Sequence, residues 1–192
     1  LAVDMTRYAG EWVAIVVADD AYIAEDALDL IEVDYEPLDA VVDPEVAFAE
    51  TERFVHPDHG SNVLYHGNFV WGGVDEDFAA ADERLDLRVR WGRSATVPIE
   101  TFGVLAQWNE GTEILDIWAS IQMPNFVELM ASTLGYPLNS IRLHQDVDVG
   151  GSYGVKRGIK QSVLAAYLSR KLRRPVRLIE DRLWNMAGGG AH

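Results

Sequence analysis

The protein is a chain of 192 residues with 48% hydrophobic residues, which predicts a folded core rather than disorder, and it contains no apolar run of about 18 residues that could cross a membrane. Its net charge of −15 argues against nucleic acid as a partner, because neutralising phosphates requires clustered Lys and Arg. The absence of cysteine means that the chain forms no disulfide and supplies no thiolate to an iron–sulfur cluster.

Residues 1–55 predict a small α/β unit. Residues 11–18 (EWVAIVVA) are apolar and rich in β-branched side chains, which is typical of a strand buried on both faces. A helical stripe follows over 21–32, a second short strand over 33–35, and a helix with proline in its permitted first turn over 44–50. We expect the strand over 11–18 to pack on the helix over 21–32.

Residues 52–73 are rich in turn-forming residues and histidine, which indicates a linker and the start of a second domain. The remaining sequence predicts helices and strands, including a hairpin around Asn109-Glu110-Gly111. The expected fold class is therefore α+β, with a small α/β lobe followed by a mixed α/β domain. The elements expected after residue 73 are helices over 75–81, 124–134 and 159–172, strands over 85–91, 104–108, 114–119, 141–147 and 176–179, and a last helix from Asp181 to the glycines at 188–190.

Basic residues gather between positions 156 and 177, whereas the first 52 residues are rich in Asp and Glu. Two interpretations stay open from the sequence. The segment could face an anion or an acidic partner, or it could form the solvated face of a helix, which is the more common arrangement.

Residues 7–18 (RYAGEWVAIVVA), 24–27 (AEDA) and 31–38 (IEVDYEPL) are similar to the second half of the small hammerhead domain in one enzyme family. That family is the large, molybdenum-binding subunit of the xanthine dehydrogenase/aldehyde oxidase-type hydroxylases. The resemblance covers essentially the whole chain. It implies the C-terminal half of the hammerhead domain over 1–55 and the N-terminal part of the molybdopterin-binding domain over 60–192.

Residues 119–124 (ASIQMP) resemble the family's Ser-Thr-Gln-x-Pro turn between a strand and a helix. The resemblance implies that the Gln122 amide donates a hydrogen bond to an oxygen on molybdenum, where a neutral donor polarises the group without adding charge. Without the resemblance, the simpler interpretation is that Gln122 caps the helix beginning at Pro124. Pro98-Ile99-Glu100 resembles the family's Pro-x-Glu segment, and we expect Glu100 to cap a turn rather than to catalyse.

A glycine-rich segment over 148–156 (DVGGSYGVK) resembles the family's DVGGGFGGK loop. Glycine is needed where a backbone approaches a ligand closely or adopts positive φ, and a loop between a strand and a helix suits an anionic group. Without the resemblance, a tight turn is the simpler interpretation. The residues that the resemblance implies at the molybdenum–pterin cofactor are Gly150, Gly151, Ser152, Tyr153 and Gly154, with no direct metal ligand.

The sequence departs from the family pattern at four positions. Ser152 replaces the third glycine, Tyr153 replaces phenylalanine and Val155 replaces glycine. Arg157 stands where xanthine dehydrogenases carry a substrate-binding Glu, so it is the candidate substrate residue, and the reversed charge argues against purine recognition through an acid at this position.

The resemblance implies a molybdenum hydroxylase, an oxidoreductase that oxidises an aldehyde or N-heterocycle with water as the oxygen source. No signal peptide is visible in the sequence, so we expect a cytoplasmic protein. Its 2Fe–2S clusters and FAD are expected on partner subunits or domains, and we expect an oligomer. The family's catalytic Glu has no counterpart in the chain, so we expect a piece of the large subunit that contains no catalytic residue and is inactive without the remainder of that subunit.

Three alternatives stay open. The chain could be a non-catalytic subunit or assembly piece of the same family, which the altered glycine loop favours. It could be an unrelated acidic binding module whose glycine segment is only a turn. Within the family, it could belong to a carbon monoxide dehydrogenase-type large subunit, whose distinguishing cysteine loop would fall outside this sequence.

Overall fold

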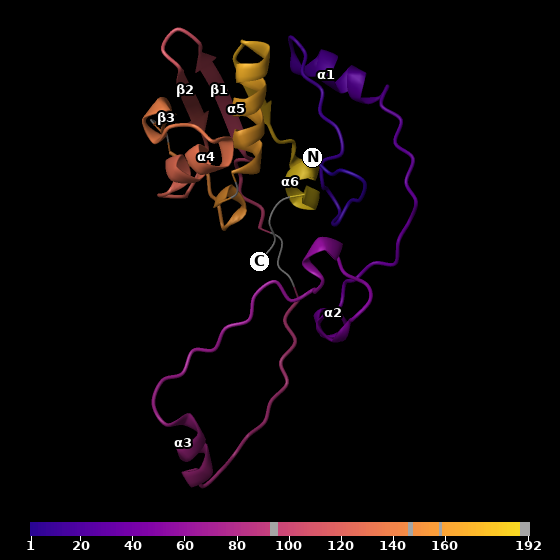
Figure 1. Cartoon of the computed structure of the whole chain (residues 1–192), viewed down its shortest axis with the longest axis vertical. Coiled ribbons are helices and arrows are strands. Elements are labelled where there is room, and N and C mark those ends of the chain that lie inside the picture. The colour runs from indigo at the N-terminus through magenta and orange to yellow at the C-terminus, as the bar shows by residue number, and fades with distance from the viewer. Residues whose placement is uncertain (93–95, 146–147, 158, 189–192) are drawn as a thin grey trace. The chain divides into compact units, whose positions relative to one another are not determined.

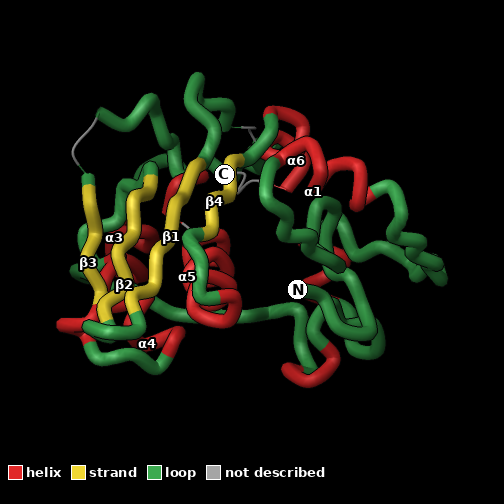
Figure 2. Tube along the Cα trace, turned by 90° about the horizontal axis from the view of Figure 1, so that it is seen from above, coloured by secondary structure: helices red, strands yellow, loops and turns green. Residues whose placement is uncertain are grey.

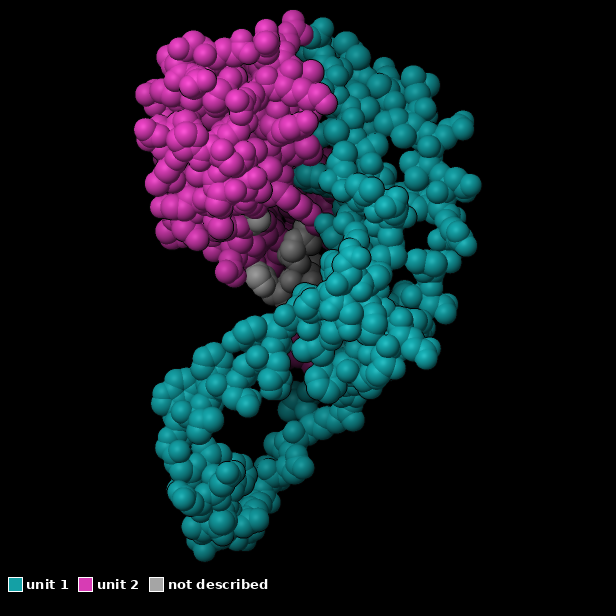
Figure 3. Space-filling model, in the orientation of Figure 1, with its two compact units in different colours: residues 1–90 teal, residues 91–192 magenta. Residues whose placement is uncertain are grey.

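The computed structural model describes residues 1–92, 96–145, 148–157 and 159–188. The chain divides into two compact units, residues 1–90 and residues 91–192, which are coloured separately in Figure 3. The domain boundary expected between residues 55 and 60 falls inside the first unit, and that boundary stays a prediction. Each unit is described by itself.

The second unit contains a four-stranded mixed sheet with strand order β3-β2-β1-β4 (Figure 2). Strand β1 is antiparallel to both β2 and β4, while β2 and β3 are parallel. The predicted hairpin is confirmed, with Ala106 opposite Ile117 in the register. The strand bounds are Gly103–Asn109 for β1, Ile114–Ala119 for β2, Ile141–His144 for β3 and Val176–Ile179 for β4.

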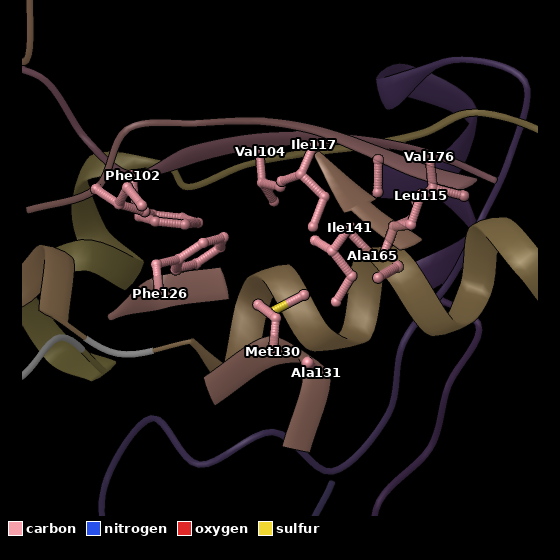
Figure 4. Close-up of a cluster of buried hydrophobic side chains, with 13 residues drawn as sticks. Phe102, Val104, Leu115, Ile117, Phe126, Met130, Ala131, Ile141, Ala165 and Val176 are labelled. Atoms are coloured by element: carbon pink, nitrogen blue, oxygen red, sulfur yellow. The ribbon is translucent and has the colours of Figure 1, made fainter. Parts of the chain in front are cut away.

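The core of this unit lies between one face of the sheet and two helices, α4 (Phe126–Leu134) and α5 (Lys160–Leu172). Side chains alternate along β1 and β2, so that every second residue points into the core. Figure 4 shows the sheet residues meeting Met130 and Ala165 from the helices. The buried hydrophobic residues are Phe102, Val104, Ala106, Leu115, Ile117, Ile121, Phe126, Met130, Ala131, Ile141, Ala165, Ala166 and Val176.

The helices expected in the second unit are confirmed, with small shifts at their ends. Helix α4 ends at Gly135, whose φ of 68° is the left-handed conformation that glycine adopts without strain. Helix α6 (Arg182–Gly188) begins after Asp181, whose carboxylate accepts the Trp184 N–H at 2.7 Å. The expected ends of the strand at 146–147 and of the last helix at 189–190 lie outside the described residues.

Part of the basic segment is partnered inside this unit. The Arg170 guanidinium lies over the rings of Trp108 and Tyr136, at 4.7 and 4.8 Å from their centroids, and Arg173 forms an ion pair with Glu110 at 2.8 Å. Both arginines are nevertheless exposed, so these contacts lie on the solvated face that the more common interpretation expects. Hydrogen bonding and the charge of Tyr136 raise the pKa of Arg170.

The first unit contains helices but no strand among its described residues. The helices expected over 44–50 and 75–81 are confirmed as α2 (Pro44–Ala49) and α3 (Val74–Ala80), and both appear in Figure 1. Helix α1 (Ala21–Leu28) is shorter than expected and buries no residue. Across the described parts of both units, no helix is long and apolar enough to cross a membrane.

The strands expected over 11–18, 33–35 and 85–91 are wrong, and so is the packing of 11–18 on a helix as a strand. The sequence pattern identifies backbone that can extend, but a strand exists only when its N–H and C=O groups pair with a neighbouring strand. The described residues of the first unit provide no such neighbour. Large apolar side chains of this region remain exposed instead, Leu87 at 70% and Trp71 at 76% among them.

Candidate functional site

Three segments singled out in the sequence meet at one end of the strands in the second unit. Glu100 precedes β1, Gln122 follows β2, and the glycine loop (residues 148–156) follows β3 and precedes α5. Because β1 runs antiparallel to β2 and β2 runs parallel to β3, the start of β1 lies beside the ends of β2 and β3. The strand order therefore brings together residues that are far apart in the chain.

One carboxylate oxygen connects these segments. Glu100 Oε2 accepts hydrogen bonds from Ser120 Oγ at 2.9 Å, from the Gly150 N–H at 2.6 Å and from Lys156 Nζ at 2.6 Å. The Lys156 side chain is 0% exposed, whereas that of Glu100 is 41% exposed. The Glu100 backbone N–H also donates to Gly150 O at 3.2 Å. The glycine loop is thus bound to Glu100 near its beginning and at its end.

These contacts determine the charge of Glu100. Partial burial acts to raise the pKa of its carboxyl group. The hydrogen bonds from Lys156, Gly150 and Ser120, together with the positive charge of Lys156, outweigh that effect and hold the pKa below its ordinary value of 4.5. Glu100 is therefore an ionised acceptor at neutral pH, paired with a buried ammonium group.

Two glycines let the loop approach its neighbours closely. A Cβ on Gly150 would lie 2.6 Å from the Cβ of Glu100, too close for any real side chain. Gly151 has a φ of 93°, and a Cβ there would lie 3.2 Å from the Cβ of Pro98. Glycine at both positions is explained by close approach of the backbone.

The second half of the loop forms a compact turn. Tyr153 and Gly154 both have positive φ, 50° and 98°, and the Val155 N–H donates to Ser152 O at 3.1 Å. Ser152 Oγ accepts the Lys156 N–H at 3.2 Å. The serine that replaces the family's third glycine therefore stabilises the turn with its side chain.

Gln122 lies against this turn and does not cap α4. Its Oε1 accepts the Gly154 N–H at 3.4 Å, and its backbone N–H donates to Lys156 O at 3.3 Å. The first residue before α4 is Asn125, and no side chain caps that helix. The capping alternative for Gln122 is thus wrong. Because Oε1 faces the loop, the Nε2 donor is directed to the other side of the amide.

Several donors at this site have no partner among the described residues. They are Gln122 Nε2 and the backbone N–H groups of Ser152 and Tyr153. Gln122 and Tyr153 are exposed, Tyr153 at 67%. Neutral donors of this kind suit the oxygen and sulfur atoms of an anionic group. Within the ranges that the structure describes, no three His, Cys, Asp or Glu residues gather in a way that could hold a metal ion directly.

Arg157 is exposed at the end of the short 3-10 turn η3 (Val155–Arg157), and its backbone N–H donates to Gly154 O at 3.2 Å. The structure thus places the candidate substrate residue directly after the loop. Its exposed guanidinium adds a positive charge at the end of this segment.

A buried carboxylate, that of Glu180, lies at the same end of the strands. Glu180 follows β4, and its backbone N–H donates to Phe102 O at 2.9 Å. Its two oxygens accept from Gln161 Nε2 at 2.6 Å and from Asn185 Nδ2 at 2.9 Å. This network joins the first turn of α5 to α6.

Sequence reasoning missed the central role of Glu100 and its pairing with Lys156. Glu100 accepts a backbone N–H, as a turn cap does, but the donor belongs to Gly150 and not to a neighbouring turn. Its partners lie 50 and 56 residues away, a separation that no local pattern encodes. The signal available in the sequence was that Glu100 and Lys156, which carry opposite charges, belong to two motifs of the same family resemblance.

Two family models match the chain. The model of the molybdopterin cofactor-binding domain matches residues 55–192, and that of the aldehyde oxidase and xanthine dehydrogenase a/b hammerhead domain matches residues 1–39.

Curated relatives and a solved structure are similar over nearly the whole chain. The nicotine 6-hydroxylase large subunit of Paenarthrobacter nicotinovorans is 35% identical over 195 residues, which are 100% of this chain and 24% of that subunit. The carbon monoxide dehydrogenase large chain of Hydrogenophaga pseudoflava is 31% identical over 97% of this chain and 25% of its own. The crystal structure of quinoline 2-oxidoreductase from Pseudomonas putida 86 has a TM-score of 0.85 and 37% identity, covering 100% of this chain and 24% of that one. The chain spans about a quarter of the length of these relatives.

Proposed function

Because the chain belongs to the molybdopterin cofactor-binding family of the aldehyde oxidases and xanthine dehydrogenases, we propose that Gln122 and residues 150–154 hold a molybdenum–pterin cofactor in the large subunit of a molybdenum hydroxylase. The observation that carries the proposal is the convergence of Gln122 with the glycine loop. The Gly154 N–H donates to Gln122 Oε1 at 3.4 Å, and both segments keep donors that have no partner among the described residues.

The donors fit such a group. Molybdopterin presents phosphate, sulfur and oxygen atoms, which accept hydrogen bonds from backbone N–H groups and from side-chain amides. Ser152 and Tyr153 supply backbone donors, and Gln122 supplies Nε2. Gly151, at a φ of 93°, keeps the loop free of a side chain where the backbone bends.

When bound, the molybdenum–pterin group would supply the redox chemistry: the substrate's C–H becomes C–OH with oxygen from water, two protons are released, and two electrons leave toward the iron–sulfur clusters and FAD. The residues of this chain orient the group, and the contacts between Gln122 and the loop keep the donors in place. Gln122 donates from a neutral amide, so it stabilises negative charge without fixing a compensating positive charge nearby. Arg157 provides a positive charge next to the loop that favours a substrate carrying a hydrogen-bond acceptor over one that needs an acid for recognition.

We assign the parent protein's substrate to the aromatic N-heterocycles or aldehydes. The names of two relatives, nicotine 6-hydroxylase and quinoline 2-oxidoreductase, support a heterocycle. The carbon monoxide dehydrogenase-type alternative has weaker support, at 31% identity. Iron–sulfur and FAD-binding subunits or domains complete the electron path in this proposal, and the protein is cytoplasmic.

The proposed domain arrangement has the C-terminal half of a hammerhead domain over 1–55 and the start of the molybdopterin-binding domain over 60–192. Many large apolar side chains of the first unit are exposed, including Trp71 and Leu87. Exposed apolar surface tends to associate, which supports the proposal that other parts of the assembly cover these side chains. We therefore include the remainder of the large subunit and an oligomeric state in the proposal.

The experiment is purification of the full-length protein with its partner subunits, followed by measurement of molybdenum, pterin and hydroxylation of a quinoline or pyridine substrate in oxygen-18 water. Stoichiometric molybdenum and label in the product support the proposal. Protein that is folded, fully assembled and free of pterin after expression in a molybdenum-supplied host would refute it.

A further inference from the structure

The segments that carry the proposed cofactor contacts share one acceptor atom. Glu100 Oε2 accepts from Ser120, two residues before Gln122, and from Gly150 and Lys156 of the glycine loop. A displacement of this oxygen therefore moves the Gln122 turn and the loop together. Its distance from all three donors is 2.9 Å or less, within the range of strong hydrogen bonds to a charged acceptor.

Lys156 depends on the same carboxylate, because its side chain is buried beside it. Its side chain is 0% exposed, and a buried ammonium group is unfavourable unless an anion compensates it. Glu100 supplies that anion at 2.6 Å. The Lys156 carbonyl accepts the Gln122 N–H at 3.3 Å, so this residue contacts Glu100 with its side chain and the Gln122 turn with its backbone.

We propose that Glu100 is a positioning residue, which fixes the spacing between Gln122 and the glycine loop through Lys156, Gly150 and Ser120. It acts on the cofactor through these neighbours and does not touch the cofactor itself. Donors held in place before the ligand arrives bind it without reorganising, which is how outer residues control occupancy of a buried group. This inference rests on the proposed function.

The test compares full-length wild-type protein with Glu100→Ala and Glu100→Gln. Molybdenum and pterin are measured after dialysis, and hydrogen exchange is followed in peptides covering 148–157. We expect Glu100→Ala to lower molybdenum content by about tenfold or more and to speed exchange in the loop. Glu100→Gln keeps a carbonyl acceptor of the same shape and should recover part of both. The matched control is Glu110→Gln, which breaks an exposed ion pair at the opposite end of β1.

A further variant tests whether Glu100 acts through Lys156. Lys156→Met removes the buried charge, so Glu100→Gln should do less harm in that background than in the wild type. Exchange in peptides from the β1–β2 hairpin checks that each variant folds. The positioning role is overturned if Glu100→Ala folds by this criterion and keeps wild-type molybdenum content and wild-type exchange in the loop. It is also overturned if the effects of Glu100→Gln and Lys156→Met on loop exchange are strictly additive. Wild-type protein that lacks molybdenum and pterin would refute the proposed function, while loop exchange would still decide the role of Glu100.

Discussion

Gly150 and Glu100 approach each other so closely that a methyl group on Gly150 would lie 2.6 Å from the Cβ of Glu100 and 3.2 Å from its Oε2. The same pair is joined by two hydrogen bonds, one from the Gly150 N–H to the carboxylate and one from the Glu100 N–H to Gly150 O. The beginning of the glycine loop is thus fixed by contact as well as by charge.

Gly150→Ala should separate the loop from Glu100 without removing any charge. The added methyl group cannot be accommodated unless the backbone shifts, so both hydrogen bonds lengthen. We expect local opening of the loop to become easier by about 2 kcal/mol, measured by hydrogen exchange in the full-length protein. Gly111→Ala is the control, because a Cβ there would meet only Asn109 Oδ1 at 3.5 Å, an ordinary contact. Equal exchange in Gly150→Ala and wild type would show that the loop tolerates a side chain here.

Gln122→Ala should reduce turnover far more than stability. Loss of one preorganised neutral donor typically costs about a hundredfold in rate, roughly 3 kcal/mol. The measurement is steady-state turnover per molybdenum in the full-length enzyme with its partners, alongside its thermal midpoint. Gln107→Ala, at an exposed position of β1, serves as the matched glutamine control. If turnover per molybdenum is the same for Gln122→Ala and wild type, Gln122 has no functional role at the cofactor.

The loop should lose stability in acid. Because the pKa of Glu100 is lower in the folded protein than its ordinary value of 4.5, the folded state favours the charged carboxylate. Its stabilising contribution is fully present above pH 4.5 and is lost as the pH falls through the lowered pKa of the folded state. Exchange in the loop, measured against pH, should show a difference between wild type and Glu100→Gln that shrinks in this acidic window. If the difference in loop exchange between wild type and Glu100→Gln stays constant until Glu100 is fully protonated, the carboxylate does not stabilise the loop.

Glu180→Ala should destabilise the junction of α5 and α6. Gln161 and Asn185, both buried, would each lose an acceptor, and an unsatisfied buried amide costs about 1–3 kcal/mol. Exchange in peptides covering 159–188 reports the effect, and Glu110→Gln is again the exposed control. Unchanged exchange would mean that water replaces the carboxylate at both amides.

The second unit could be predicted from the sequence because its strands and helices pack against one another. Alternating residues in β1 and β2 have helices α4 and α5 to pack against, so local pattern and tertiary contact agree. The strand expected over 11–18 failed for the opposite reason. Its β-branched residues favour extended backbone, but a strand needs a neighbouring strand to pair with, and the described residues of the first unit contain none.

The candidate site was predicted in its parts and not in its connections. Gln122 and the glycine loop were expected near each other through a family resemblance, and their contact at 3.4 Å is a structural fact. Glu100 was assigned to a turn because the sequence carries no information on which donors a carboxylate reaches across 50 residues. Only the strand order decides that Gly150 and Lys156, rather than nearby backbone, bind this acid.

The three bonds to Glu100 Oε2 also imply an order of assembly during folding. They close separations of 20, 50 and 56 residues, to Ser120, Gly150 and Lys156 respectively. Loop closure over longer separations costs more chain entropy and is compensated only once the intervening strands are in register. The β1–β2 hairpin can therefore bring Ser120 to Glu100 early, whereas burial of the Lys156 ammonium must wait until β3 has joined β2. A nascent chain that has emerged only as far as the hairpin lacks Gly150 and Lys156, so the glycine loop takes its final form only after β3 has joined the sheet.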